Sequence, residues 1–288
     1  MKISTCRVFR FRINNFLIVL GVIILIQNLT KIFGLELIYD VPALRIRRTL
    51  IIADPHIGYS TQTYRYSTRA KERISMYQAL SMFSMISATK EEYMRRLIIL
   101  GDIKESIGVP RKFVLKAIQR FLTKLTELFK QVIIVRGNHD GKLVDILDEL
   151  DLEVSIVDHV SLRSSEGRIL ITHGHMKAPY EDLMAANIVI TGHIHPATDI
   201  DKVFVVANYT LRDSNKTLII VPTINPMLQG TAVNCNTIKN TLIRISPPEL
   251  QREIKLKKIR LLGKVTRKEI PCDKICLLYT SPSPRDRG

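Results

Sequence analysis

The stretch VIIVRGNHD, residues 132–140, joins a short apolar run to a polar turn that contains a histidine. Its first four residues are β-branched and uninterrupted, which is typical of strands buried on both faces of a sheet. Gly137 then permits a sharp turn, and Asn138, His139 and Asp140 follow it. The stretch predicts a buried strand whose carboxyl end carries polar side chains.

Four other apolar runs end in the same way. They cover residues 50–53, 97–100, 169–171 and 188–190, and they lead into Asp54, Gly101-Asp102, Thr172-His173 and Thr191-Gly192-His193. Ligands at the carboxyl ends of adjacent parallel strands converge, because the loops there form a common crevice. We therefore expect these polar side chains to meet at one site.

The segments between and after these runs indicate the fold class. Apolar residues recur in steps of three or four over 67–95, 110–129 and 142–150, which predicts helices with Pro110 in a first turn. After Glu153 the predicted elements are strands, at 154–157, 160–163, 169–172, 188–191, 203–207, 217–221 and 241–245. Helices and strands in this order indicate an α/β domain with a mixed sheet, or with two sheets packed together.

The polar residues at the strand ends form a ligand set for metal ions. Two carboxylates, four histidines and one amide are available, namely Asp54, Asp102, His56, His173, His193, His195 and Asn138. Mixed oxygen and nitrogen donors suit manganese, iron or zinc. A single histidine at a strand end is ordinarily structural, but five such motifs in succession are not expected by chance.

This order of motifs resembles the calcineurin-like metallophosphoesterase superfamily over roughly residues 36–246. The most similar branch is prokaryotic and includes archaeal phosphoesterases and ligase-associated DNA damage response endonucleases. The segments that carry the resemblance are ADPHIG at 53–58, GDIKESIG at 101–108, GHIHPA at 192–197 and PTINPMLQGTAVN at 222–234. The resemblance implies a sandwich of two mixed β-sheets flanked by helices, in the layer order αββα.

The resemblance also implies a role for each site residue. One divalent metal ion would be held by Asp54, His56 and His195, and a second by Asn138, His173 and His193. Asp102 would bridge the two ions. His139 would lie near the scissile phosphate without binding metal, and Asp140 would orient it. Mn²⁺ is the expected metal, with Mg²⁺, Fe²⁺ and Zn²⁺ as alternatives.

The implied activity is hydrolysis of phosphodiester bonds in nucleic acid or nucleotides. A hydroxide that bridges the metals would attack phosphorus, and His139 would stabilise charge or protonate the departing oxygen. Two alternatives stay open: a phosphomonoesterase for a small metabolite, and a non-catalytic metal-binding interaction module. The nuclease interpretation adds nucleic acid as the expected partner.

Three positions depart from the branch. Pro55 stands where the branch usually has leucine, and it removes a backbone donor between two predicted ligands. Many relatives carry histidine at the position of Glu105 and glutamate at that of Ile194, so we expect substrate contacts there to differ. His175 is expected to line the pocket.

The charge of the chain is concentrated at its ends. The 43 basic and 27 acidic residues give a net charge of +16, of which residues 1–33 carry +5 and residues 248–288 carry +6. Residues 34–247 retain only +5. A basic balance favours polyanionic partners, whereas a mildly basic core also fits a small phosphorylated substrate. The Lys- and Arg-rich stretch 251–268 is a candidate for nucleic-acid binding, or a solvated element at the domain edge.

These features divide the chain into four parts. Residues 1–33 are an N-terminal extension, and residues 34–247 are the catalytic domain. Residues 248–275 are a basic extension, and residues 276–288 are a non-native or disordered tail. The apolar run 16–26 follows several basic residues but is shorter than the roughly 20 residues that span a bilayer, so the extension is either a start chosen too early or a weak membrane anchor.

The four cysteines are sparse and indicate no disulfide framework. Free thiols are typical of reducing compartments. We therefore expect a cytoplasmic protein.

Overall fold

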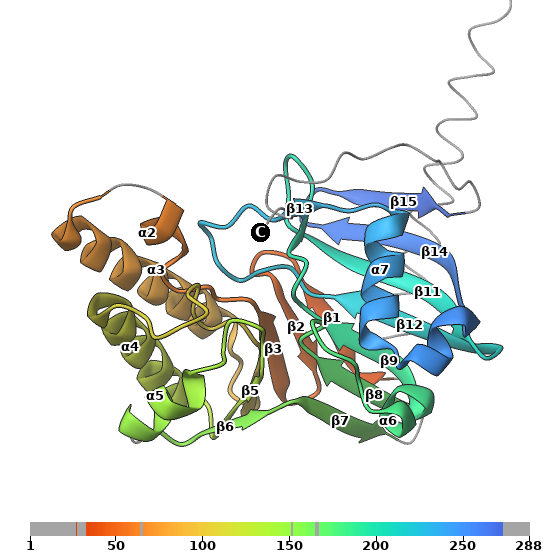
Figure 1. Cartoon of the computed structure of the whole chain (residues 1–288), viewed down its shortest axis with the longest axis horizontal. Helices are drawn as coiled ribbons and strands as arrows, with labels where there is room; N and C mark the ends of the chain where they lie inside the picture. Colours follow the sequence, from red (N-terminus) through yellow and green to blue (C-terminus); the bar gives the residue numbers. More distant parts are fainter. Residues whose placement is uncertain (1–26, 28–32, 64–65, 151, 165–166, 273–288) are drawn as a thin grey trace, which may run out of the picture.

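The computed structural model describes residue 27 and residues 33–63, 66–150, 152–164 and 167–272. Two β-sheets lie face to face, with helices on the outer side of each (Figure 1). The predicted tail, and all of the N-terminal extension except residues 27 and 33, lie outside the described residues. In the described part of the chain, no helix has both the length and the apolar character needed to cross a membrane.

The first sheet contains six strands in the order of the sequence. They are β1 (Leu35–Ile38), β2 (Ala43–Ile46), β3 (Thr49–Ala53), β4 (Arg96–Leu100), β5 (Gln131–Val135) and β6 (Val154–Val157). Strands β1 to β3 are antiparallel, and β3 to β6 are parallel. Both faces of the central strands are buried: in β4, Leu97 and Ile99 pack toward the helices, and Ile98 and Leu100 toward the other sheet. This explains the uninterrupted apolar runs.

Four helices belong to this half of the molecule, namely α2 (Tyr59–Thr63), α3 (Thr68–Thr89), α4 (Lys112–Leu128) and α5 (Leu143–Leu150). The Ser67 side chain accepts a hydrogen bond from the Ala70 amide and so caps α3. Helix α4 buries an apolar stripe that includes Val114, Phe121 and Leu125. The expectation that Pro110 lies in a first turn was wrong, because Arg111 is the N-cap of α4.

The second sheet has seven strands, ordered β15-β14-β11-β12-β9-β8-β7. Their bounds are β7 (His159–Ser164), β8 (Gly167–Thr172), β9 (Ala186–Thr191), β11 (Val203–Leu211), β12 (Ser214–Ile220), β14 (Ile254–Gly263) and β15 (Arg267–Pro271). Strands β8, β9 and β12 are parallel to one another, and the other pairings are antiparallel. A short parallel pair, β10 (Pro196–Ala197) with β13 (Thr231–Ala232), lies apart from both sheets. The expected basic extension thus contributes β14 and β15 to the second sheet.

The outer face of the second sheet is covered by α6 (Tyr180–Ala185), α7 (Cys235–Ile245) and a 3₁₀-helix (Pro248–Glu253). Here one prediction was wrong, because residues 241–245 are the end of α7 and not a strand. Ile238, Leu242 and Ile245 recur at helical spacing and pack on the sheet. The helix begins at Asn234, whose side chain accepts from the Thr237 amide.

Three apolar cores hold these layers together. One lies between the first sheet and its helices, one between the two sheets, and one between the second sheet and α6 and α7. Ile51 and Ile98 from the first sheet meet Ile190 and Ile219 from the second in the middle core. The αββα sandwich of two mixed sheets is therefore confirmed.

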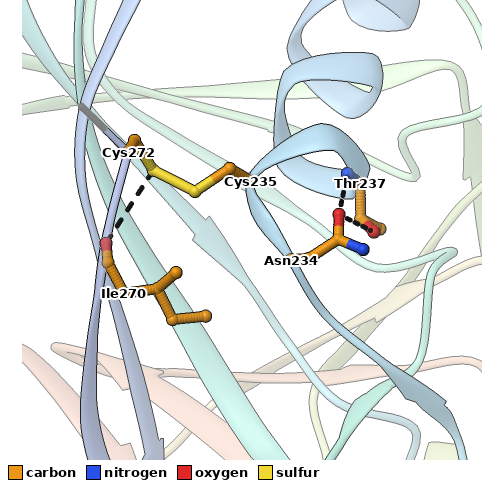
Figure 2. Close-up of a disulfide and its surroundings, with 5 residues drawn as sticks. All are labelled: Asn234, Cys235, Thr237, Ile270 and Cys272. Carbon is orange, nitrogen blue, oxygen red and sulfur yellow. Dashed lines mark hydrogen bonds between the residues drawn. A yellow bond between two sulfur atoms is a disulfide. The ribbon is translucent and has the colours of Figure 1, made fainter. Parts of the chain in front are cut away.

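A disulfide joins Cys235, at the start of α7, to Cys272, just after β15 (Figure 2). The two Cα atoms are 6.0 Å apart, although the residues are 37 positions apart in the sequence. The expectation of no disulfide was wrong, because the spacing of cysteines does not reveal which of them meet in the fold. Since stable disulfides are typical of oxidising compartments, the argument for a reducing compartment no longer holds, and a cytoplasmic location stays a prediction.

Candidate metal centre

The polar residues predicted at the strand ends converge from both sheets. Asp54 follows β3, Asp102 follows β4, and His173 follows β8. The Asp54 Oδ1 atom lies 3.0 Å from His173 Nε2, although 119 residues separate the two in the sequence. The Asp54 and His173 side chains are fully buried. The site therefore lies at the seam where the carboxyl ends of the parallel strands of both sheets meet.

A first group of ligand atoms is formed by Asp54, His56 and His195, all within 4.8 Å of one another. His56 Nε2 lies 3.1 Å from His195 Nε2, and His195 Nε2 lies 3.6 Å from Asp54 Oδ1. Two imidazole nitrogens and a carboxylate oxygen thus face a common point. These donors suit a divalent transition-metal ion.

A second group of ligand atoms is formed by Asp102, His173 and His193. The Oδ2 atom of Asp102 lies 3.5 Å from His173 Nε2 and also 3.5 Å from His56 Nε2, which belongs to the first group. Asp102 also forms a group with His56 and His139. One carboxylate oxygen therefore stands between the two histidine sets, where a bridging ligand would be needed.

The backbone at these residues is strained. Asp54, His56, Asp102, His193 and His195 have φ values of 53°, 42°, 51°, 71° and 47°. Residues other than glycine adopt this left-handed backbone conformation rarely and at a cost of about 1–3 kcal/mol. Such conformations persist only where the surrounding structure enforces them, and they cluster at functional sites.

Two glycines let the backbone approach the carboxylates closely. A Cβ atom on Gly137 would lie 2.1 Å from Asp102 Oδ1, and one on Gly192 would lie 2.7 Å from Asp54 Oδ2. Neither position has room for a side chain unless a carboxylate moves. The glycines in the two turn motifs therefore permit the packing of the site.

The pKa shifts of Asp54, His193 and His175 favour the forms that bind metal, whereas at His173 burial lowers the pKa but Asp54 and Asp102 raise it overall. Burial raises the pKa of Asp54, but the neighbouring His195 and His173 outweigh it and lower this pKa below its usual range. Burial, together with the charge of His173, lowers the pKa of His193 to about 3 and that of His175 to about 4. An ionised carboxylate and neutral imidazoles are the forms that bind metal ions.

The imidazole of His56 is oriented by Glu105. Glu105 Oε2 lies 2.8 Å from His56 Nδ1, on the side of the ring opposite the nitrogen that faces His195. Burial lowers the pKa of His56, but the close contact with Glu105 and the charges of Asp54 and Asp102 raise it overall. Carboxylate–histidine pairs of this kind fix the tautomer and increase the basicity of a ligand.

The carboxylate of Asp140 is engaged by backbone amides. Its carboxylate accepts hydrogen bonds from the amides of Asp102 (2.7 Å), Ile103 (3.0 Å) and Gly137 (2.9 Å), and it is buried. The Nδ1 atom of His139 instead donates to the backbone carbonyl of Glu105. Asp140 therefore fixes the loops after β4 and β5, while Glu105 holds the ring of His139. Asn138 is exposed in the same loop, and its role as a ligand stays a prediction.

A loop after β12 makes hydrogen bonds to the backbone beside the predicted ligands Asp54 and His56. The Thr223 hydroxyl donates to the Asp54 carbonyl at 2.7 Å, and the Asn225 side chain donates to the carbonyl of Pro55 at 2.9 Å. We assigned these residues no role from the sequence, although the stretch 222–234 contributed to the resemblance. Pro55 is tolerated here because its carbonyl, and not an amide hydrogen, makes the contact.

Comparisons with known proteins identify the family of this chain. The family model for the calcineurin-like phosphoesterase superfamily domain matches residues 48–222. Nuclease MPE of Pseudomonas putida is a similar solved structure, with 20% sequence identity, 82% of this chain and 94% of that chain covered, and a TM-score of 0.46. An archaeal phosphodiesterase shares 16% identity, with 77% and 98% covered and a TM-score of 0.33. No match was found among the curated proteins.

Proposed function

Because this chain belongs to the calcineurin-like phosphoesterase superfamily, we propose that it hydrolyses phosphodiester bonds with two divalent metal ions. The observation that carries the proposal is the position of Asp102, whose carboxylate lies between two groups of ligand atoms. A mononuclear site would need no carboxylate at that position. Nucleic acid or nucleotides are the proposed substrates.

The residues at the centre fit a dinuclear site. Asp54, His56 and His195 would hold one ion, and His173, His193 and Asn138 the other, with Asp102 shared. This mixture of carboxylate, imidazole and amide donors favours Mn²⁺, while Fe²⁺, Zn²⁺ or Mg²⁺ would satisfy parts of it. When bound, the two ions neutralise charge on the phosphate and lower the pKa of a water molecule that can attack phosphorus.

The chain itself supplies the group that assists the leaving oxygen. The Nδ1 atom of His139 contacts a carbonyl oxygen, which can only accept a hydrogen bond, so Nδ1 carries a proton and Nε2 is the remaining donor or acceptor. The His139 ring centroid lies 5.1 Å from that of His56. Held in this way, the protonated ring can donate from Nε2 to an oxygen that departs from phosphorus.

Hydrolysis of bis(p-nitrophenyl) phosphate with Mn²⁺ tests this function. We expect clear turnover by the wild type and a loss of about 10²-fold or more in His139→Ala. His159→Ala is a matched control, because His159 pairs with Asp182 at the edge of the second sheet, and it should keep the wild-type rate. Equal rates in the wild type and His139→Ala would contradict the proposed role of His139.

A second candidate is a phosphomonoesterase for a small metabolite, which the charge of only +5 over residues 34–247 favours. Hydrolysis of p-nitrophenyl phosphate, with no hydrolysis of the diester, would support it. A folded protein that binds Mn²⁺ and hydrolyses neither ester would instead be the non-catalytic binding module.

A further inference from the structure

A groove opens directly beside the proposed metal centre. Its volume is about 430 Å³, and it lies between α2, the first turns of α3 and α4, and the loop that follows β4. Ile57, which follows His56, and Ser106, which follows Glu105, line its inner end. A ligand in the groove would therefore extend from the metal centre outward between α3 and α4, which are neighbours on the left of Figure 1.

The wall of the groove is tied to His139 through Lys104. The Lys104 side chain is fully buried, and its Nζ atom donates to the carbonyl of Ser106, which lines the groove, to those of Ile107 and Gly108 in the same loop, and to that of His139. His139 also contacts the carbonyl of Glu105, at the start of the same loop. The groove is therefore on the His139 side of the centre, where the leaving group of the proposed reaction would depart.

The charged side chains that line the groove are both basic. Lys71 and Arg111 line it, and the described residues that line it include no carboxylate. The nearby turns of α3 and α4 also carry Arg69, Arg73, Lys112 and Lys116, none of which lines the groove. The one acidic neighbour in these turns, Glu72, lies 3.7 Å from Lys116 Nζ. Such a surface favours a ligand that carries more than one phosphate.

The groove also offers apolar surface. Phe113 and Val114 line it from the first turn of α4, and Val109, with 73% of its surface exposed, lines it from the loop. An aromatic ring beside a positive groove is the arrangement that binds unpaired bases by stacking. The volume of about 430 Å³ is in the range of pockets for small ligands, so the groove fits about one nucleotide.

We propose that this groove binds the leaving-group side of a single-stranded nucleic acid. The first nucleotide beyond the scissile phosphate would lie against Phe113 and Val109, and the next phosphates would contact Lys71 and Arg111. The inference rests on the proposed function, and it narrows the substrate from phosphodiesters in general to single strands that continue past the cleaved bond.

Binding of a fluorescein-labelled single-stranded DNA 12-mer to the full chain in EDTA, followed by fluorescence anisotropy, tests the groove without turnover. The variant is Lys71→Ala/Arg111→Ala. The matched control is Lys255→Ala/Lys257→Ala, which removes two exposed lysines from β14 in the basic stretch 251–268. We expect the groove variant to bind at least about tenfold more weakly, and the slope of log K against log salt to fall by about 2.

Three outcomes would overturn the inference: wild-type affinity in the groove variant, equal weakening in the β14 control, or tighter binding of a 12-mer duplex than of the single strand. With Mn²⁺ added, the ratio of kcat/KM for the 12-mer to kcat/KM for bis(p-nitrophenyl) phosphate should be lower in the groove variant than in the wild type. If Lys71→Ala/Arg111→Ala unfolds, Val109→Asp tests the same groove from the exposed loop. Wild-type turnover of the small diester decides the proposed function separately, so the two failures are distinguishable.

Discussion

The two sheets contribute different chemistry to the candidate metal centre. In the described part of the chain, the carboxylates at the centre follow strands of the first sheet: Asp54, Asp102, Glu105 and Asp140. The second sheet contributes imidazoles, from His173, His175, His193 and His195. The first sheet also contributes two imidazoles, from His56 and His139. The carboxylates thus come from one half, whereas the group of Asp54, His56 and His195 and the group of Asp102, His173 and His193 each combine residues from both sheets.

The two halves also differ in how they are fixed. The first-sheet loops are held by buried hydrogen bonds from backbone amides to Asp140. The second-sheet half reaches across the seam, where the His193 amide donates to Asp54 Oδ2 at 2.9 Å. Packing of the sheets therefore assembles the site. A substitution among the first-sheet carboxylates, which we call the acidic half, should affect both groups of ligand atoms.

The largest expected effect comes from Asp102→Asn, because one oxygen of this carboxylate lies 3.5 Å from a histidine of each group. We expect turnover of bis(p-nitrophenyl) phosphate to fall by more than about 10²-fold, a loss typical of removing one preorganised charge-stabilising group. Mn²⁺ stoichiometry, measured by calorimetry, should also fall from two ions toward one. Asp158→Asn is the control, since Asp158 is an exposed carboxylate that lies 3.7 Å from Arg136. Full activity in Asp102→Asn would contradict the proposal that its carboxylate serves both groups of ligand atoms.

A smaller effect is expected from Glu105→Gln, which tests whether the acidic half orients an imidazole. Glutamine removes the charge of the side chain that lies 2.8 Å from His56 Nδ1 and keeps its size and shape. Affinity for Mn²⁺ should fall by about 10–100-fold, and excess Mn²⁺ should restore turnover because no ligand has been removed. Glu72→Gln on α3 is the control. If excess metal did not restore the rate, Glu105 would act on the substrate and not through His56.

Sequence patterns predicted those elements whose own residues carry a local signal. Runs such as 97–100 and 132–135 are apolar throughout because both faces of the strand are buried, so their boundaries were nearly correct. Residues 241–245 were mistaken for a strand because a five-residue window cannot show the helical spacing that begins at Ile238. The Cys235–Cys272 pairing depends on two elements that meet only in the fold.

The same reasoning applies to the site. Residues at strand ends could be predicted, because topology brings such ends together. The supporting contacts could not: Asn225 lies 170 residues from Pro55, and Lys104 meets His139 across 35 residues. Their side chains give no local signal of a partner. The part that escaped prediction is the set of contacts that fixes the ligands in place.

The smallest effect is expected from His175→Gln, which tests whether His175 is held neutral beside the ligands of the second sheet. Burial and then His173, 2.9 Å away between the two Nδ1 atoms, lower the pKa of His175 to about 4, while an unfolded chain has a value near 6.5. As the pH falls from 7 to 5, the unfolded state therefore binds a proton that the folded state does not, and the metal-free protein loses stability.

His175→Gln removes this proton uptake, so the free energy of unfolding of the wild type should fall by about 1 kcal/mol more than that of the variant between pH 7 and pH 5. Urea unfolding in EDTA at both pH values measures the difference. At His56 and His173, burial lowers the pKa but neighbouring carboxylates raise it overall, so proton binding there favours the folded state and the dependence has the opposite sign. Parallel pH profiles for the wild type and His175→Gln would mean that His175 is not held neutral.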